Sequence, residues 1–196
     1  LKLARQGKHV VRLKSGDPAI FGRAGEEIEV LEAAGIPVAI IPGITSASAM
    51  AATLGISLTH RDHAHSVRFV TGHSRDGGLP KDLDWQGLAD PGTTLLIYMG
   101  GRTAAAFAGK LIGEGLSPVT PAVALSCLTR PNQTVWQGTL GELAYGASVS
   151  EFQQPVIIGV GQVFIARQSR LEAVNGDLVQ DGVSRPRDRI LLSAKS

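Results

Sequence analysis

The chain is poor in cysteine, in aromatic residues and in long apolar runs. Its one cysteine, Cys127, excludes an intramolecular disulfide and favours a reducing, cytoplasmic compartment. Aromatic residues make up only 5%, which argues against the stacking surfaces that bind single-stranded nucleic acids. The most apolar region, 33–58, is interrupted by prolines and glycines, so it predicts no membrane span.

The chain also lacks a large excess of positive or negative charge. The 19 basic and 17 acidic residues leave a formal net charge of +2. A nucleic-acid partner would need a concentrated basic surface, so none is predicted. What the chain does have is 43% apolar residues and 24 glycines. This composition predicts a folded chain with a buried core and many tight turns, and it excludes a disordered one.

The order of apolar and helical patterns predicts an α/β fold. Segments 9–13 and 37–41 are rich in β-formers and each ends at a turn, while 23–34 and 45–54 have the spacing of helices. This strand–helix–strand–helix order predicts a parallel α/β sheet. A second α/β block follows a polar stretch near residues 60–67. Its expected strands are 67–71, 93–99, 122–128, 134–137 and 155–160, and its expected helices are 102–114 and 139–144.

Two loops follow the first two predicted strands. Ser15-Gly16-Asp17-Pro18 comes after one, and residues 42–48 come after the other. Consecutive parallel strands would place both loops at one edge of the sheet, where α/β proteins bind ligands. From the residues alone, a turn capped by Asp17 and a well-capped helix explain the same patterns. Both interpretations therefore stay open at this point.

Charged residues near these loops suit a substrate that carries several carboxylates. Arg23 and Glu26 lie three residues apart on one predicted helix face, and Arg61 follows the end of the apolar block. Arginine binds carboxylates in a bidentate manner. The alternative is a solvated ion pair between Arg23 and Glu26 that contributes little.

The histidines are weaker candidates. His60, His63 and His65 share an irregular segment, so solvated side chains are a better interpretation than a metal site, and no metal is predicted. His73 follows a predicted strand and is of the residue type that transfers protons near neutral pH. Cys127 lies in an apolar strand and is expected in the core.

Seven motifs together resemble those of the tetrapyrrole methylases. They occur in the expected order over about residues 5–165, and they are residues 10–18, 20–27, 42–46, 55–61, 70–73, 83–85 and 97–100. The resemblance implies two α/β domains with the active site in the cleft between them, and a homodimer. Within the family, Thr59-His60-Arg61 and Leu83-Asp84-Trp85 are similar to members that methylate uroporphyrinogen III.

The resemblance implies a specific reaction. Methyl groups would pass from S-adenosylmethionine to C2 and C7 of uroporphyrinogen III, giving precorrin-2 for sirohaem and cobalamin biosynthesis, with S-adenosylhomocysteine as the other product. Alternatives within the superfamily are another precorrin methyltransferase and a diphthine synthase. A further alternative is a non-catalytic fragment that binds a tetrapyrrole.

The resemblance also assigns site residues. Substrate-binding charges are expected at Arg23, Glu26 and Arg61. The cofactor-binding positions are expected at Ser15, Gly16, Asp17, Ile20, Thr45, Ser46, Met99 and Leu128. Ser15 and Leu128 stand where the family usually has glycine.

Domain limits follow from the same comparison of motifs. Family members begin with further strands and an aspartate thought to act as the base, so this chain is expected to lack an N-terminal segment, and its catalytic base is unassigned. Residues 1–62 are then expected to be the remainder of an incomplete N-terminal domain, 63–166 a C-terminal α/β domain, and 167–196 a polar tail.

Overall fold

The computed structural model describes residues 1–146 and 155–167. By its contacts the chain divides into one unit over Leu1–Ile165 and another over Ala166–Ser196. The predicted polar tail lies outside the described residues from position 168 onward. The separation of 1–62 from 63–166 stays a prediction.

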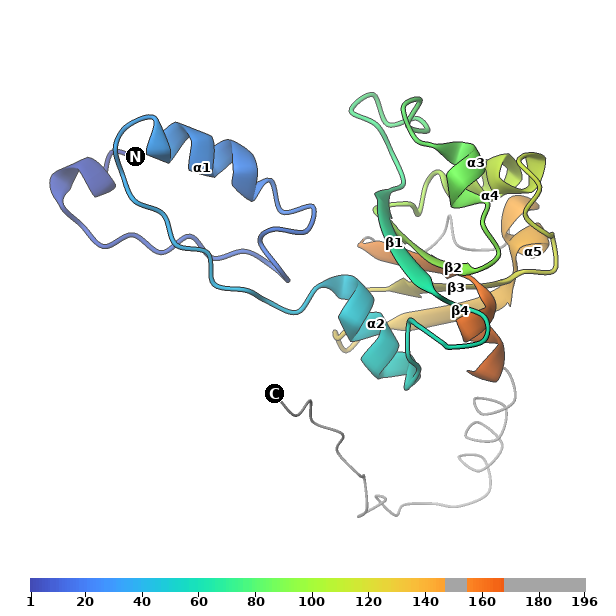
Figure 1. Cartoon of the computed structure of the whole chain (residues 1–196). Helices are drawn as coiled ribbons and strands as arrows, with labels where there is room; N and C mark the ends of the chain where they lie inside the picture. The colour runs from blue at the N-terminus through green and yellow to red at the C-terminus, as the bar shows by residue number, and fades with distance from the viewer. Residues whose placement is uncertain (147–154, 168–196) are drawn as a thin grey trace, which may run out of the picture. The chain divides into compact units, whose positions relative to one another are not determined.

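The first unit contains a five-stranded sheet (Figure 1). Its strand order is β1-β2-β5-β3-β4, and the strands are β1 Ser66–Thr71, β2 Thr93–Tyr98, β3 Pro121–Ser126, β4 Thr134–Thr139 and β5 Val156–Val160. Every strand expected in the second α/β block is present within a few residues. The pattern succeeds because these segments are apolar and rich in β-branched residues; β2 and β5 are buried along their whole length.

The sheet is mixed, whereas the parallel sheet predicted for the first 55 residues does not form. Only β1 and β2 are parallel, and the pairs β2–β5, β5–β3 and β3–β4 are antiparallel. The reason lies in the connections: β3 and β4 are joined by residues 127–133, too few for the helical crossover that a parallel pair needs. β5 then runs opposite to both of its neighbours.

Helices cover both faces of the sheet. On one face, α3 Trp85–Leu88, α4 Ala104–Gly113 and α5 Leu140–Ala144 pack against side chains such as Leu95 and Ile97 of β2. On the other face, α2 Ser46–Leu54 and the 3₁₀ helix η3 Gln162–Arg167 pack against Leu96 and Tyr98. Successive β2 residues thus alternate between two apolar clusters, as the strand period of two requires.

The predicted strands at 9–13 and 37–41 do not form, and this corrects the expected strand–helix–strand unit. Neither segment pairs with a strand in the described part of the chain, and apolar side chains remain outside, with Val11 69% and Ile41 79% exposed. A strand is stable only beside another strand, whose backbone groups satisfy its own. Local β-propensity therefore does not produce a strand here.

The helices of this part form as expected. They are α1 Ala24–Glu32 and α2, preceded by the short 3₁₀ helix η1 Ala4–Gln6. α1 buries none of its residues, whereas α2 buries Ala47, Met50 and Leu54. Among the described residues, no helix has the length and apolar character needed to cross a membrane.

Candidate functional site

The candidate site lies at one edge of the sheet. Strands β1, β2 and β3 run in the same direction, because β1 is parallel to β2 and both β2 and β3 oppose β5. Their carboxyl ends therefore meet at one edge, which we call the carboxyl edge and define by Gly72, His73, Met99, Cys127 and Leu128. Ligands of open α/β sheets bind beyond the carboxyl ends of strands.

Two residues of the carboxyl edge have strained backbones. Met99 has φ 58° and Cys127 has φ 48°, both in the left-handed region. Side chains with a Cβ rarely adopt this conformation, which costs about 1–3 kcal/mol and concentrates at ligand sites. Two such residues, each directly after a strand of the same direction, mark the carboxyl edge as the candidate site.

Tyr98 joins this edge to the start of α2. Its hydroxyl lies 2.5 Å from Oγ1 of Thr45 and accepts a hydrogen bond from the amide of Ala47 at 3.1 Å. Thr45 is the N-cap residue of α2, but its side chain caps no amide of the helix. The buried phenol of Tyr98 instead satisfies one of the free amides at the helix start. Tyr98 thus places Thr45 and Ser46 beside the end of β2, next to Met99.

Apolar contacts bring further predicted residues to the same place. Ile20 and Leu128 both pack against the cluster that contains Tyr98 and Ala47. The ring of Phe21 lies 4.8 Å from that of Tyr98, centroid to centroid. The structure therefore places Thr45 against Tyr98, and Ile20 and Leu128 on the apolar cluster that contains Tyr98, while Met99 follows Tyr98 directly in the chain. Tyr98 lies within the 97–100 motif, but the sequence assigned it no role of its own.

The two loops 15–18 and 42–48, which we call the glycine loops, are held together, as the sequence predicts. Asp17 accepts hydrogen bonds from the amide of Ala19 at 2.8 Å and from the amide of Gly43 at 3.1 Å. Gly43 lies so close that a Cβ on it would sit 2.4 Å from the carbonyl oxygen of Gly16. The carboxylate of Asp17 therefore acts as a clamp that joins the two loops by hydrogen bonds. The two strands that were expected to position the loops do not form. The alternative of a turn capped by Asp17 and the alternative of a ligand loop are both compatible with this clamp.

Lys14 anchors the first loop to α1, and sequence reasoning missed it. Its ammonium group donates to the carbonyl of Gly22 at 2.7 Å and to Oε1 of Glu27 at 2.9 Å, with only 15% of its side chain exposed. The hydrogen bond from Lys14 lowers the pKa of Glu27 below its usual value. Lys14 precedes the 15–23 segment and is hydrogen-bonded to Gly22 near its end and to Glu27 beyond it. These bonds hold the two ends of the segment in place.

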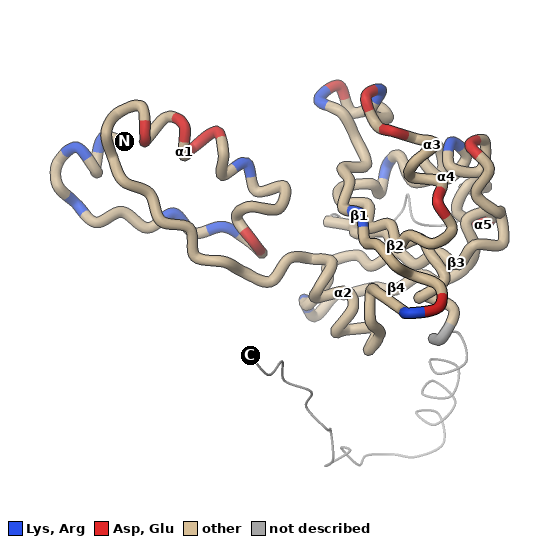
Figure 2. Tube along the Cα trace, in the orientation of Figure 1, with Lys and Arg blue, Asp and Glu red and all other residues tan. Residues whose placement is uncertain are grey.

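The predicted substrate-binding residues Arg23, Glu26 and Arg61 have different surroundings. Arg23 and Glu26 form the expected ion pair, with Nη2 2.5 Å from Oε2, and both side chains are largely exposed. The hydrogen bond between them raises the pKa of Arg23 and lowers that of Glu26. Arg61 is exposed, and its carbonyl accepts a hydrogen bond from Nε2 of His65 at 2.9 Å. Within the described ranges, no hydrogen bond or ion pair joins the side chain of Arg61 to Arg23 or Glu26. Figure 2 shows both signs of charge distributed along the chain.

The histidine segment is a locally bonded loop. The rings of His60 and His63 stack at 3.8 Å, and Nδ1 of His60 accepts a hydrogen bond from the amide of Asp62 at 3.2 Å. In the part of the chain that the structure describes, no three His, Cys, Asp or Glu side chains are grouped so that they could hold a metal ion.

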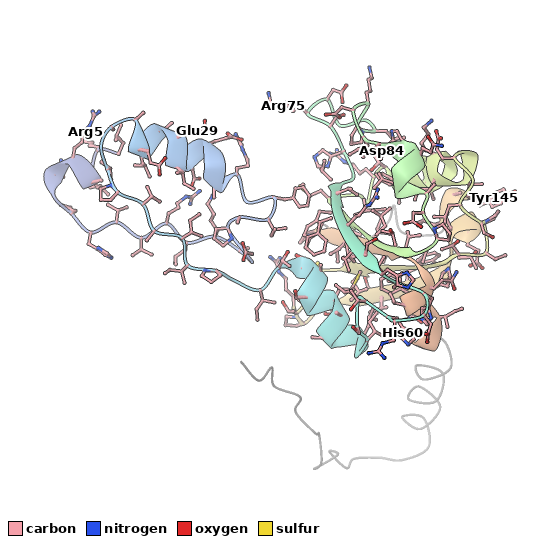
Figure 3. The ribbon with its side chains drawn as sticks, in the orientation of Figure 1. Arg5, Glu29, His60, Arg75, Asp84 and Tyr145 are labelled. Atoms are coloured by element: carbon pink, nitrogen blue, oxygen red, sulfur yellow. The ribbon has the colours of Figure 1, made fainter. Side chains whose placement is uncertain are left out.

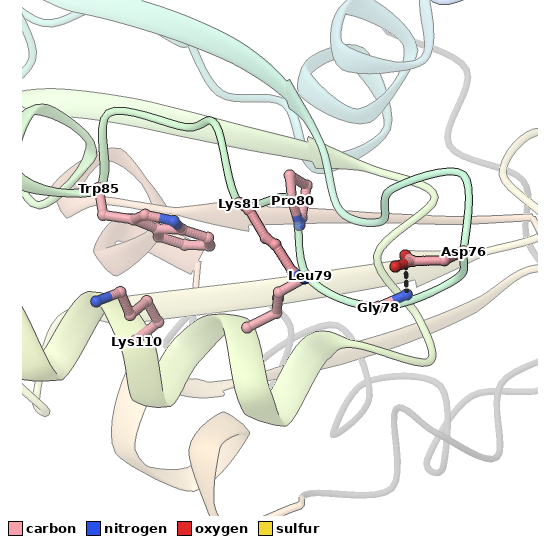
Figure 4. Close-up of a pocket in the computed structure, with 7 residues that line it drawn as sticks. All are labelled: Asp76, Gly78, Leu79, Pro80, Lys81, Trp85 and Lys110. Atoms are coloured by element: carbon pink, nitrogen blue, oxygen red, sulfur yellow. Dashed lines mark hydrogen bonds between the residues drawn. The ribbon is translucent and has the colours of Figure 1, made fainter.

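A separate pocket of about 490 Å³ lies between the 76–81 loop and the helices α3 and α4 (Figure 4). It is lined by Asp76, Gly78, Leu79, Pro80, Lys81, Trp85 and Lys110. Trp85 packs on Phe107 with 4.6 Å between ring centroids, and Lys110 pairs with Glu114 at 2.7 Å. None of the predicted site residues lines this pocket, so it is not the candidate site.

Fold and site together define an α/β protein with a candidate ligand site at the carboxyl edge. Residues 1–144 match the family model of the Tetrapyrrole (Corrin/Porphyrin) Methylases, and the chain belongs to this family. The family resemblance of the motifs is therefore confirmed, and so is the α/β fold class.

Relatives and solved structures agree with this assignment. The chain is 51% identical over 166 residues to the siroheme synthase of Stutzerimonas stutzeri (strain A1501), covering 85% of this chain and 35% of that protein. It is 50% identical over 163 residues to the siroheme synthase of Pseudomonas aeruginosa (strain UCBPP-PA14), covering 83% and 35%. The chain thus spans about a third of the length of these curated relatives.

Among solved structures, the native uroporphyrin III C-methyl transferase of Thermus thermophilus aligns with a TM-score of 0.72 and 36% identity, covering 83% of this chain and 67% of that one. The same Thermus thermophilus enzyme complexed with S-adenyl homocysteine aligns with a TM-score of 0.71 and 36% identity, covering 83% and 69%. The cobalamin biosynthetic enzyme cobalt precorrin-4 methyltransferase aligns with a TM-score of 0.73 and 27% identity, covering 82% and 66%.

Proposed function

We propose that this chain is part of an S-adenosylmethionine-dependent C-methyltransferase that acts on uroporphyrinogen III at C2 and C7 and yields precorrin-2. The observation that carries the proposal is that Thr45 contacts the Tyr98 hydroxyl, that Ile20 and Leu128 pack on the apolar cluster that contains Tyr98, and that Met99 directly follows it. The likeness to a uroporphyrin III C-methyl transferase, itself solved with S-adenyl homocysteine, supports the cofactor and the substrate. The pathway would be sirohaem or cobalamin biosynthesis.

The residues at the carboxyl edge fit such a cofactor. S-adenosylmethionine supplies an electrophilic methyl group on a sulfonium. Thr45 and the exposed Ser46 offer hydroxyls at the start of α2, and Met99 offers backbone groups on a half-exposed strand end. Ile20 and Leu128 add apolar surface. The clamped loop with Ser15, Gly16 and Asp17 completes the set we assign to the cofactor.

The substrate would be bound by charge. Uroporphyrinogen III carries many carboxylates, and the exposed guanidinium groups of Arg23 and Arg61 are suited to bind them. Glu26 already holds Arg23 through two hydrogen bonds, and so limits the orientations of its guanidinium. We further propose a homodimer in the cytoplasm. The exposed apolar side chains of 9–13 and 37–41 and the single cysteine support these two assignments.

A binding measurement followed by a transfer assay tests the proposal. Calorimetric titration with S-adenosylhomocysteine is expected to saturate near one site per chain. Methyl-labelled S-adenosylmethionine and uroporphyrinogen III should then give labelled precorrin-2. Transfer to a later precorrin but not to uroporphyrinogen III would overturn the substrate assignment. Binding without transfer to any tetrapyrrole would favour a non-catalytic role.

Arginine variants separate the two halves of the site. Arg61→Gln is expected to raise the KM for uroporphyrinogen III and leave the affinity for S-adenosylhomocysteine unchanged. Arg5→Gln, on the exposed η1 helix, is the matched control and should change neither. Equal effects of the two variants on KM would remove Arg61 from the substrate site.

A further inference from the structure

The ends of β1 and β2 are tightly joined at the carboxyl edge. The amide of Gly72 donates to the carbonyl of Tyr98 at 2.7 Å, and the hydroxyl of Thr103 donates to the carbonyl of Gly72 at 2.6 Å. A Cβ on Gly72 would sit 2.4 Å from Cα of Gly100. The backbones on either side of Met99 are therefore fixed against the end of β1.

Met99 itself is held by a side chain. Nδ1 of His73 lies 3.1 Å from the carbonyl oxygen of Met99. A carbonyl oxygen only accepts, so Nδ1 must carry the hydrogen, which sets the ring tautomer. The carbonyl of His73 accepts from the hydroxyl of Thr71 at 3.1 Å, so the main chain of the histidine is anchored as well.

We propose that His73 is a positioning residue for the cofactor site: its Nδ1–H group holds Met99 in the left-handed conformation and so orients the backbone that faces the cofactor. A methionine at φ 58° is unfavourable by itself and needs surrounding contacts to persist. The hydrogen bond to the Met99 carbonyl opposes relaxation toward the extended region. This inference rests on the proposed function, because it assigns a role within the same site.

Three substitutions test the role of the Nδ1 atom. His73→Asn keeps an N–H group at the place of Nδ1, since both atoms are bonded to Cγ. His73→Gln carries its amide nitrogen at the place of Nε2, and His73→Ala removes both groups. We expect His73→Ala and His73→Gln to weaken S-adenosylhomocysteine binding by about fivefold to tenfold, the range of one lost hydrogen bond, and His73→Asn to stay within about twofold of the unmodified chain. Melting temperatures of the three variants should agree closely with one another.

Two results would overturn the proposal. One is an affinity for His73→Ala equal to that of the unmodified chain. The other is a His73→Asn variant that binds S-adenosylhomocysteine as weakly as His73→Ala and, like it, transfers no methyl group. The imidazole ring would then act in proton transfer instead.

A ligand-free measurement separates this proposal from the proposed function. Nitrogen-15 NMR of the unmodified chain should show Nδ1 of His73 protonated, and the Met99 amide resonance should shift in His73→Ala but not in His73→Asn. That outcome supports positioning of Met99 even if S-adenosylhomocysteine does not bind. An Nε2–H tautomer refutes it even if the cofactor binds well.

Discussion

The hydroxyl of Tyr98 accepts a hydrogen bond from the buried amide of Ala47 at 3.1 Å, although the two residues are far apart in sequence. The same hydroxyl contacts Thr45 at 2.5 Å. A single phenol therefore links the last residue of β2 to the first turn of α2, where the candidate cofactor residues Thr45 and Ser46 lie.

Removing that phenol oxygen should destabilise the chain and weaken the site. In Tyr98→Phe the buried Ala47 amide loses its acceptor, at an expected cost of about 1–3 kcal/mol in the free energy of unfolding, measured by urea denaturation. The affinity for S-adenosylhomocysteine should fall as well. Tyr145→Phe is the matched control, because Tyr145 is 96% exposed and points outward (Figure 3). Equal stability of the two variants would show that the Tyr98 hydroxyl has no structural role.

A methyl group between the two glycine loops should separate them. Gly43→Ala would place Cβ 2.4 Å from the carbonyl oxygen of Gly16, so one loop must move and the Asp17 hydrogen bond to residue 43 must lengthen. We expect a calorimetric loss of cofactor-product affinity of about 1 kcal/mol or more. Gly109→Ala, in α4 where nothing lies within 4 Å, should bind normally and gain up to about 1 kcal/mol of stability. Unchanged affinity in Gly43→Ala would mean that loop spacing does not matter for binding.

Lys14 should matter for binding without touching the carboxyl edge. Lys14→Met keeps the apolar stem but removes the hydrogen bonds to the Gly22 carbonyl and to Glu27, so the 15–23 segment is no longer anchored. The expected result is faster amide hydrogen exchange across 15–23 and weaker binding of S-adenosylhomocysteine. Lys8→Met, at an exposed position, provides the control. Identical exchange in both variants would refute the anchoring role of Lys14.

The pH dependence of stability should contain a contribution from Glu27. Its hydrogen bond with Lys14 lowers its pKa in the folded chain below the ordinary value of 4.5. A depressed carboxyl pKa stabilises the fold above the unfolded pKa, and this stabilisation is lost as pH falls through the folded pKa. Unfolding curves of the unmodified chain and of Glu27→Gln should therefore differ above about pH 4.5 and converge below it. Curves that stay equally far apart at every pH would contradict this.

Local sequence patterns predicted most of the elements around the site. The five strands of the sheet and the helices α2, α4 and α5 were predictable because their apolar periodicity and turn residues agree with their burial in the fold. Segments 9–13 and 37–41 have equally good patterns and no partner strand in the described residues, so the same reasoning failed there. A strand's stability depends on its neighbour, which no local pattern contains.

The ordered motifs were enough to identify the family from the residues alone. The mixed strand order, the left-handed backbones of Met99 and Cys127, and the contacts of Tyr98 and Lys14 became visible only in the folded chain. These features depend on hydrogen bonds and close packing that no local sequence pattern contains. The contacts of Tyr98, for example, arise only once the folded sheet places the end of β2 beside the start of α2.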